Sequence, residues 1–139
     1  MIIDAKDLIL GRVASYAAKQ AMLGQKIDIV NAELSIITGQ RLEIIKDYKR
    51  RFEMGIHTKG PFHYKMPDRF MRRAIRGMLP YKTHRGREAY EKIKCHLGIP
   101  DQFKSQKPQT IVKAHVDKVP HTKYITVKEI CNEMGARLK

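Results

Sequence analysis

Four arginines at helical spacing are the side chains of this chain best placed to bind a ligand by charge. They stand at positions i, i+3, i+4 and i+7 of one segment: Arg69, Arg72, Arg73 and Arg76. This spacing stacks side chains on one face of an α-helix. Apolar residues repeat at the same spacing about half a turn away: Met71, Ala74, Ile75 and Met78. The pattern predicts a helix that buries one side and presents guanidinium groups to a polyanion on the other.

The arginines belong to a strongly basic segment, residues 54–87, in which nine Lys and Arg stand against one acid, Asp68. The whole chain carries 28 Lys and Arg against 14 Asp and Glu, a formal charge of +14. The charge is uneven, because residues 49–87 net +10, residues 1–48 net zero and the remaining 52 residues net +4. Such an excess costs self-repulsion in the absence of a partner. Nucleic acid is the commonest partner of a small protein with this charge.

Loops are predicted on both sides of the arginine helix. Residues 55–65 mix glycine and proline with aromatic and basic side chains. A glycine-rich loop can bring backbone amides close to phosphate, and flat rings can stack on unpaired bases, which is typical of RNA recognition. Phe62 and Tyr64 could equally be core anchors that fix the loop. A second basic loop is predicted at residues 82–87.

The candidate RNA-binding residues are the basic and histidine side chains of these segments. They are Lys49, Arg50, Arg51, His57, Lys59, His63, Lys65, Arg69, Arg72, Arg73, Arg76, Lys82, His84, Arg85 and Arg87. Three bases in succession at 49–51 end a predicted helix, where a positive charge favours the negative pole of the helix dipole. That role explains one or two of the three and leaves the rest available to solvent or phosphate.

The first 48 residues, which net zero charge, read as a scaffold for the basic segment. A strand at 1–4, a helix over 10–21 ending before Gly24, and a strand at 27–30 predict a parallel βαβ unit and an α/β fold. Further short strands are predicted at 34–37 and at 123–126. Thr38 is a candidate N-cap for a helix that runs to about Phe52.

The rest of the chain gives weaker signals. The arginine helix should begin at Pro67 and end near Leu79, before Pro80. A further helix is predicted after the second basic loop, with an apolar edge that ends before Gly98: Ala89, Tyr90, Ile93 and Leu97. Residues 101–123 read as extended loop in which only residues 111–112 resemble a strand. Thr126 and Glu129 form a capping box for a final helix. Residues 1–139 suit one domain.

Several function classes are disfavoured by what the sequence contains. The two cysteines, Cys95 and Cys131, have no CxxC or histidine spacing and read as buried reduced thiols, so neither a metal nor a disulfide framework is expected. Gly11 stands alone where a dinucleotide loop needs three glycines. A metal-dependent nuclease needs clustered carboxylates, which the basic segment lacks. We therefore expect no catalytic residues, no cofactor and no small-molecule substrate.

Two other binding partners remain as alternatives. A helix with four arginines could enter the major groove of DNA, but the glycine and aromatic loops around it favour irregular RNA. An anionic membrane surface ranks lower, because the sequence has no Trp and the glycine-rich approach to the arginine helix is not helical. The sequence also has no run of about 18 apolar residues that could span a bilayer. The first ten residues also lack the layout of a signal peptide. These features predict a cytoplasmic protein.

Several blocks of the sequence resemble the large-subunit ribosomal protein L13 family in its archaeal form. They are DAKDLILGRVAS at 4–15, IVNAE at 29–33, ITGQR at 37–41 and IRGMLPYKTHRGREAYEKIKCHLG at 75–98. The resemblance implies a three-layer α/β/α fold around a small, mainly parallel sheet of about four strands, with basic loop and helix extensions. It also implies binding to large-subunit rRNA beside neighbouring ribosomal proteins, a role in subunit assembly and no catalysis. The family's RNA-facing parts correspond to residues 57–63 and 69–79.

Overall fold

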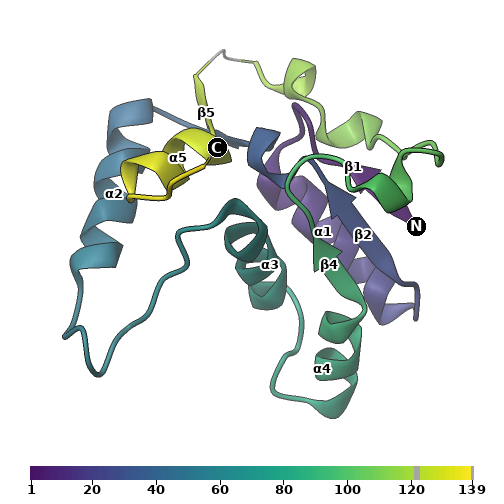
Figure 1. The fold of residues 1–139 in the computed structure, drawn as a ribbon, viewed down its shortest axis with the longest axis horizontal. Coiled ribbons are helices and arrows are strands. Elements are labelled where there is room, and N and C mark those ends of the chain that lie inside the picture. The colour runs from purple at the N-terminus through teal and green to yellow at the C-terminus, as the bar shows by residue number, and fades with distance from the viewer. Residues whose placement is uncertain (121–122, 139) are drawn as a thin grey trace.

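A small parallel sheet organises the first half of the protein. In the computed structural model, which describes residues 1–120 and 123–138, strand β1 (Ile2–Asp4) leads into helix α1 (Leu10–Met22) and then strand β2 (Ile27–Val30). β1 and β2 are parallel, and β4 (Ile93–Cys95) joins β2 in the same direction, giving the order β1-β2-β4 (Figure 1). The predicted βαβ unit and the α/β class are confirmed. Gly24 ends the α1 turn with φ +95°, a conformation that glycine adopts without strain.

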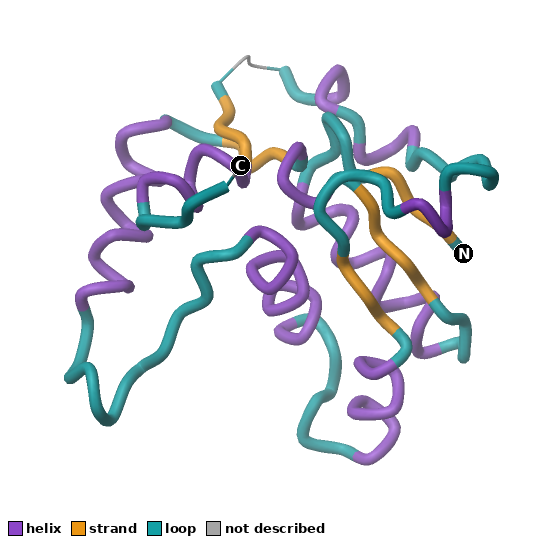
Figure 2. Tube along the Cα trace, viewed as in Figure 1, coloured by secondary structure: helices purple, strands orange, loops and turns teal. Residues whose placement is uncertain are grey.

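The two remaining strands form a separate antiparallel pair rather than a fourth member of that sheet. β3 (Ile36–Thr38) pairs with β5 (Tyr124–Thr126), and Ile37 lies opposite Ile125. Both strands were predicted near these positions. The pair brings a segment near the C-terminus back to the first third of the chain, as the orange strands at the top of Figure 2 show.

Helix α2 (Arg41–Glu53) follows β3, and its predicted N-cap is wrong. The residue before the helix is Gln40, without a side-chain cap. Thr38 lies inside β3, paired with Tyr124, and Gly39 at φ +136° makes the turn that separates strand from helix. The predicted cap of helix α5 (Val127–Glu133) is confirmed, because the Thr126 hydroxyl accepts a hydrogen bond of 3.2 Å from the Glu129 amide.

Helix α3 (Pro67–Gly77) begins at the predicted proline, whereas the following region differs from the prediction. Helix α4 (His84–Glu91) starts inside the expected basic loop and ends early, and Ile93 continues as β4. The early end of the helix follows from a contact between residues far apart in the sequence: Ile93 pairs with Ile27 at the middle of the sheet and is fully buried. A β-branched residue in that position gains more from the ladder than from a local helical turn.

Residues 101–120 are mostly irregular, as predicted. Three short 3₁₀ turns occur at 101–103, 112–114 and 116–118, so the expected strand at 111–112 is wrong. Gln109 instead meets the outer edge of β1, donating to the Ile2 carbonyl at 2.8 Å and accepting from the Asp4 amide at 3.0 Å. Residues 121–122 of the predicted loop lie outside the described residues.

The core joins the sheet to three helices. α1 packs against α3 and α4, and α3 also packs against β4. Fully buried side chains from these elements meet there, among them Ile3, Val13, Ile29, Met71, Ile75 and Ile93. Within the described residues no helix has the length and apolar character needed to cross a bilayer.

Candidate nucleic-acid interface

The arginine helix α3 is held by its apolar face. Pro67 occupies the first turn, where its missing N–H costs nothing, and Asp68 lies at the positive end of the helix. Met71 and Ile75 are fully buried, as predicted. Met78 was also expected to face inward, but it is 44% exposed because the helix ends at Gly77 and the helical period is lost. α3 is therefore a fixed support for its four arginines.

Two of these arginines lie over tyrosine rings. The Arg72 guanidinium is 4.5 Å from the centre of the Tyr90 ring on α4, and that of Arg76 is 5.2 Å from the centre of the Tyr81 ring in the turn before α4. The two rings meet edge to face, with centres 5.4 Å apart. Arg72 and Arg76 are half-buried. Their guanidinium groups therefore rest against the tyrosine rings and do not extend freely into solvent.

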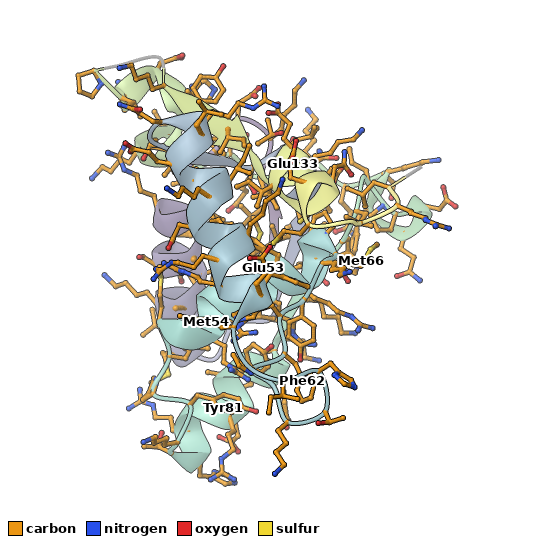
Figure 3. The ribbon with its side chains drawn as sticks, turned by 90° about the vertical axis from the view of Figure 1, so that its left-hand side faces the viewer. Glu53, Met54, Phe62, Met66, Tyr81 and Glu133 are labelled. Carbon is orange, nitrogen blue, oxygen red and sulfur yellow. The ribbon has the colours of Figure 1, made fainter. Side chains whose placement is uncertain are left out.

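The other two arginines share one ring in the preceding loop. Arg69 and Arg73 lie 5.9 and 6.0 Å from the centre of the Tyr64 ring, and Arg73 also donates a hydrogen bond of 2.6 Å to the Phe62 carbonyl. Tyr64 is 45% exposed and Phe62 is 66% exposed. The core-anchor interpretation is therefore wrong for Phe62, which projects from the loop (Figure 3). Tyr64 fixes the loop against arginines and not in the core.

The three candidate residues on α2 have a different environment, because each meets a carboxylate. Lys49 contacts Glu133 of α5 at 2.8 Å, and Arg50 and Arg51 contact Asp47 at 2.8 and 2.6 Å. A hydrogen bond from Arg50 holds the pKa of Asp47 below its usual value, and one from Lys49 does the same for Glu133. The positive charge of these three residues is partly neutralised within the protein.

The basic side chains of the two loops and of α4 are mostly exposed. His57, Lys59, Lys65, Lys82, His84, Arg85 and Arg87 all lie at the surface. Within the described residues, His84 alone among the candidates of 54–87 has an acid at ion-pair distance, Glu88 at 3.7 Å. Arg85 and Arg87 donate instead to the carbonyls of Met22 and Lys82, at 3.4 and 3.2 Å. The charge of this segment therefore remains available to an external anion.

His63 and Lys65 lie on the side of the loop that faces α2. The His63 ring is 5.9 Å from the Phe52 ring, and the Lys65 ammonium is 5.2 Å from the centre of the same phenyl ring. Burial lowers the pKa of His63, and the positive charges of Arg73 and Arg51 lower it further. Burial and these positive charges thus favour the neutral form of the His63 imidazole.

The start of α4 depends on a close backbone approach. The Thr83 hydroxyl accepts from the Gly86 amide at 3.2 Å, and a Cβ on Gly86 would lie 2.1 Å from the Pro80 carbonyl oxygen. Glycine is the residue that this contact permits. The contact fixes the start of α4, which carries Arg85 and Arg87, against the turn that follows α3.

Tyr81 and Tyr90 are the functional residues that the sequence analysis did not predict. Tyr90 was assigned to the apolar edge of a helix, and Tyr81 received no role. Their spacing from Arg72 and Arg76 does not predict contact with these arginines, because the chain turns at Pro80 between the arginines and the two tyrosines. Aromatic residues close to an acid-free arginine cluster are the only signal that could have suggested a stacking role.

The described residues give no sign of a metal centre or a reactive thiol. No three His, Cys, Asp or Glu side chains among residues 1–120 and 123–138 come together as metal ligands would. Cys95 and Cys131 are free, and burial raises the pKa of each thiol to about 12. A thiol with this pKa is almost wholly protonated at neutral pH and is a poor nucleophile.

Comparison of the sequence with known proteins places the chain in one family. The model of the family described as "Ribosomal protein L13" matches residues 1–102. The large ribosomal subunit protein uL13 of Methanosarcina barkeri is 43% identical over 137 residues, which cover 98% of each chain. The uL13 proteins of Natronomonas pharaonis and Haloarcula marismortui are each 40% identical, over 99% and 98% of this chain and 92% and 91% of their own lengths.

Proposed function

The chain belongs to the ribosomal protein L13 family, and we propose that it binds large-subunit rRNA through the basic surface of residues 54–87. Its relatives are named as large ribosomal subunit proteins, so the chain is a structural constituent of that subunit in the cytoplasm and not an enzyme. Neighbouring ribosomal proteins are its other expected partners. Support of subunit assembly is part of the proposal.

The observation that carries the proposal is the absence of internal neutralisation on this surface. Nine Lys and Arg lie between residues 54 and 87, and no carboxylate within the described ranges 1–120 and 123–138 lies at ion-pair distance from any of them. The one acid of the segment, Asp68, is half-buried. Phosphate groups of RNA supply the missing countercharge, and the counterions that they release favour binding.

The tyrosines prepare the arginines for this contact. A ring beneath a guanidinium restricts its rotamers but does not cancel its charge, and the N–H donors remain in the plane of the group. Less side-chain entropy is then lost on binding than for a freely moving arginine. Arg72 over Tyr90 and Arg76 over Tyr81 are therefore the phosphate contacts that we expect to be strongest.

The remaining candidates fall into three groups. Basic and histidine side chains of the loops and α4 are proposed to follow the local shape of the RNA: His57, Lys59, His63, Lys65, Lys82, His84, Arg85 and Arg87. Lys49, Arg50 and Arg51 are proposed as weaker contacts, because each must share its charge with Asp47 or Glu133. Arg69 and Arg73 join the first loop to the arginine helix.

The geometry of α3 disfavours the DNA alternative. A recognition helix lies in the major groove and contacts base edges with a few side chains that reach out from it. α3 packs against α1, α5 and β4, and Arg72, Arg73 and Arg76 are half-buried. Side chains held in this way extend less far from the helix, which favours contacts to phosphate in a folded RNA.

Sedimentation and binding together test the proposal. In a native cell extract the protein should migrate with the large subunit, and a free pool alone would contradict the ribosomal assignment. In filter binding, the purified protein should retain transcribed large-subunit rRNA at least about 10-fold more tightly than duplex DNA at the same salt concentration. Equal retention of the two would overturn the RNA preference.

A further inference from the structure

An open cavity of about 230 Å³ lies between α2, the loop at 55–65 and α3. Five of its lining side chains carry rings: Tyr48, Phe52, His63, Tyr64 and Phe70. Leu10, Ala74 and Met134 complete its apolar lining. Aromatic side chains gain by complete burial, yet no residue of α2 is fully buried. The ring-lined surface is therefore only partly covered by the protein itself.

The rings are arranged in two tilted pairs and do not fill the cavity by stacking on one another. Phe52 and His63 have ring centres 5.9 Å apart with planes at 41°, and Tyr48 and Phe70 have centres 5.2 Å apart with planes at 51°. Lys65 lies over the Phe52 ring and Arg51 over the Tyr48 ring, so a further flat group would contact the face that each cation leaves open. Flat aromatic guests are the natural occupants of such a site.

The charged side chains that line the cavity favour a ligand with negative charge. Arg51 and Arg73 line it, and no acid does. Arg51 shares Asp47 with Arg50, so two guanidinium groups meet one carboxylate. Arg73 donates to a backbone carbonyl and not to an acid. The lowered pKa of His63, caused by burial and then by Arg73 and Arg51, reflects the same positive field.

We propose that this cavity receives one unpaired nucleobase of the bound RNA, with an adjoining phosphate against Arg51 and Arg73. The proposal rests on the rRNA binding proposed above and adds a base-stacking site to its phosphate contacts. The cavity is smaller than the roughly 300–1,000 Å³ of sites for drug-sized ligands, which suits a single base. In its neutral form, His63 provides one ring nitrogen donor and one acceptor for the edge of the base.

Two substitutions remove the site without removing charge. Phe52→Leu deletes a ring that faces the cavity, and Ala74→Leu fills the cavity from α3. Each should weaken binding of transcribed large-subunit rRNA by about 5- to 150-fold, the range for loss of one stacked base. The dependence of affinity on salt should not change, because no phosphate contact is lost. Leu42→Ala is the matched control, since Leu42 lies on the same helix, is 80% exposed and is absent from the lining.

Zero-length ultraviolet crosslinking of the wild-type protein to the same RNA is the second measurement. Crosslinked bases should map to peptides that contain Phe52, residues 62–64 or Phe70. Crosslinks confined to other peptides would overturn the base site. This readout holds even if thermal melts show that neither variant folds.

The outcomes separate the base site from the general function. Wild-type affinity in Ala74→Leu, or a smaller salt dependence in either variant, would overturn the base site while rRNA binding stands. Failure of the wild-type protein to bind the rRNA would overturn both proposals. Micromolar binding of free AMP would identify a nucleotide site independent of RNA and would also contradict the inference.

Discussion

The end of α2 and the length of α3 are both rich in Lys and Arg and both place guanidinium groups over tyrosine rings, but within the described residues only the cations of α2 also pair with carboxylates. On α2, Lys49, Arg50 and Arg51 meet the carboxylates of Glu133 and Asp47. On α3 all four arginines lie over the rings of Tyr64, Tyr81 or Tyr90. A carboxylate cancels positive charge, whereas a ring orients a guanidinium and leaves its charge intact. Two clusters of similar size, three basic residues at the end of α2 and four on α3, therefore produce unequal surface potentials.

The two helices also differ in how firmly they are held. α3 buries Met71 and Ile75 completely, but α2 has no fully buried residue. The exposed pair between Lys49 and Glu133 is one of the contacts that attach α2 to α5. Regions with little buried apolar surface open more easily. We therefore expect α3, which is proposed to bind phosphate, to be more rigid than α2.

The largest expected effect concerns the rate at which the two cysteine thiols, one near each helix, react with an alkylating reagent. Cys95 lies on β4, against which α3 packs, and Cys131 lies on α5. Burial raises the pKa of both from 9.0 to about 12, so at about pH 8.5 each should be alkylated roughly 1,000-fold more slowly than in urea. Mass spectrometry of each cysteine peptide checks this. A thiol that reacts at the unfolded rate would show that its region opens.

The same pKa shift predicts a dependence of stability on pH. Above about pH 9 the unfolded chain loses thiol protons that the folded chain keeps, so the unfolded state binds fewer protons and the free energy of unfolding falls as pH rises toward 12. Replacing both cysteines with Ala should flatten this decline in denaturant titrations. An unchanged slope would mean that the thiols are not protected by burial.

An intermediate effect is expected from Gly86, which sets the position of α4 relative to α3. Gly86→Ala places a methyl group against the Pro80 carbonyl and should cost about 1–3 kcal/mol of unfolding free energy. It should also weaken rRNA binding, because Arg85, Arg87 and Tyr90 move with the helix. Gly77→Ala is the control, since a Cβ there meets nothing within 4 Å. Equal losses in the two variants would contradict the steric explanation.

The smallest effect should come from a single ring beneath an arginine. In a double-mutant cycle of Arg72→Met with Tyr90→Leu, we expect a coupling of about 0.5–2 kcal/mol that changes little with salt, because the pair is half-buried. The matched cycle on Arg50 and Asp47 joins two exposed groups, and its coupling should fade as salt is added. Additive effects at Arg72 and Tyr90 would remove the distinction between the two helices.

Local patterns were sufficient to predict the parts of the fold that depend on near neighbours. The βαβ unit follows from two β-branched runs around an alanine-rich helix, and α3 follows from Pro67 and the arginine spacing. β4 was missed because a ladder with Ile27, far away in sequence, decided between strand and helix. The class of fold therefore needed only local information.

The candidate site could be predicted as a set of charges but not as a geometry. Composition reveals that residues 54–87 are poor in acids, and their role as an RNA-binding surface stays a prediction. The tyrosine rings under the arginines and the pairing of Lys49 with Glu133, 84 residues away, depend on tertiary contacts. The sequence places both Lys49 and Arg72 among the candidate RNA-binding residues, and the fold shows that a carboxylate meets the first and a tyrosine ring the second.

The salt dependence of rRNA binding tests the central claim most directly. Arg72→Ala combined with Arg76→Ala should reduce the slope of log affinity against log salt by about 1.4–1.8, the sum for two phosphates. Arg50→Ala combined with Arg51→Ala removes the same formal charge from α2, and we expect less than half that reduction, because Asp47 already neutralises part of it. An unchanged slope in the α3 variant, or an equal reduction in both, would contradict the account.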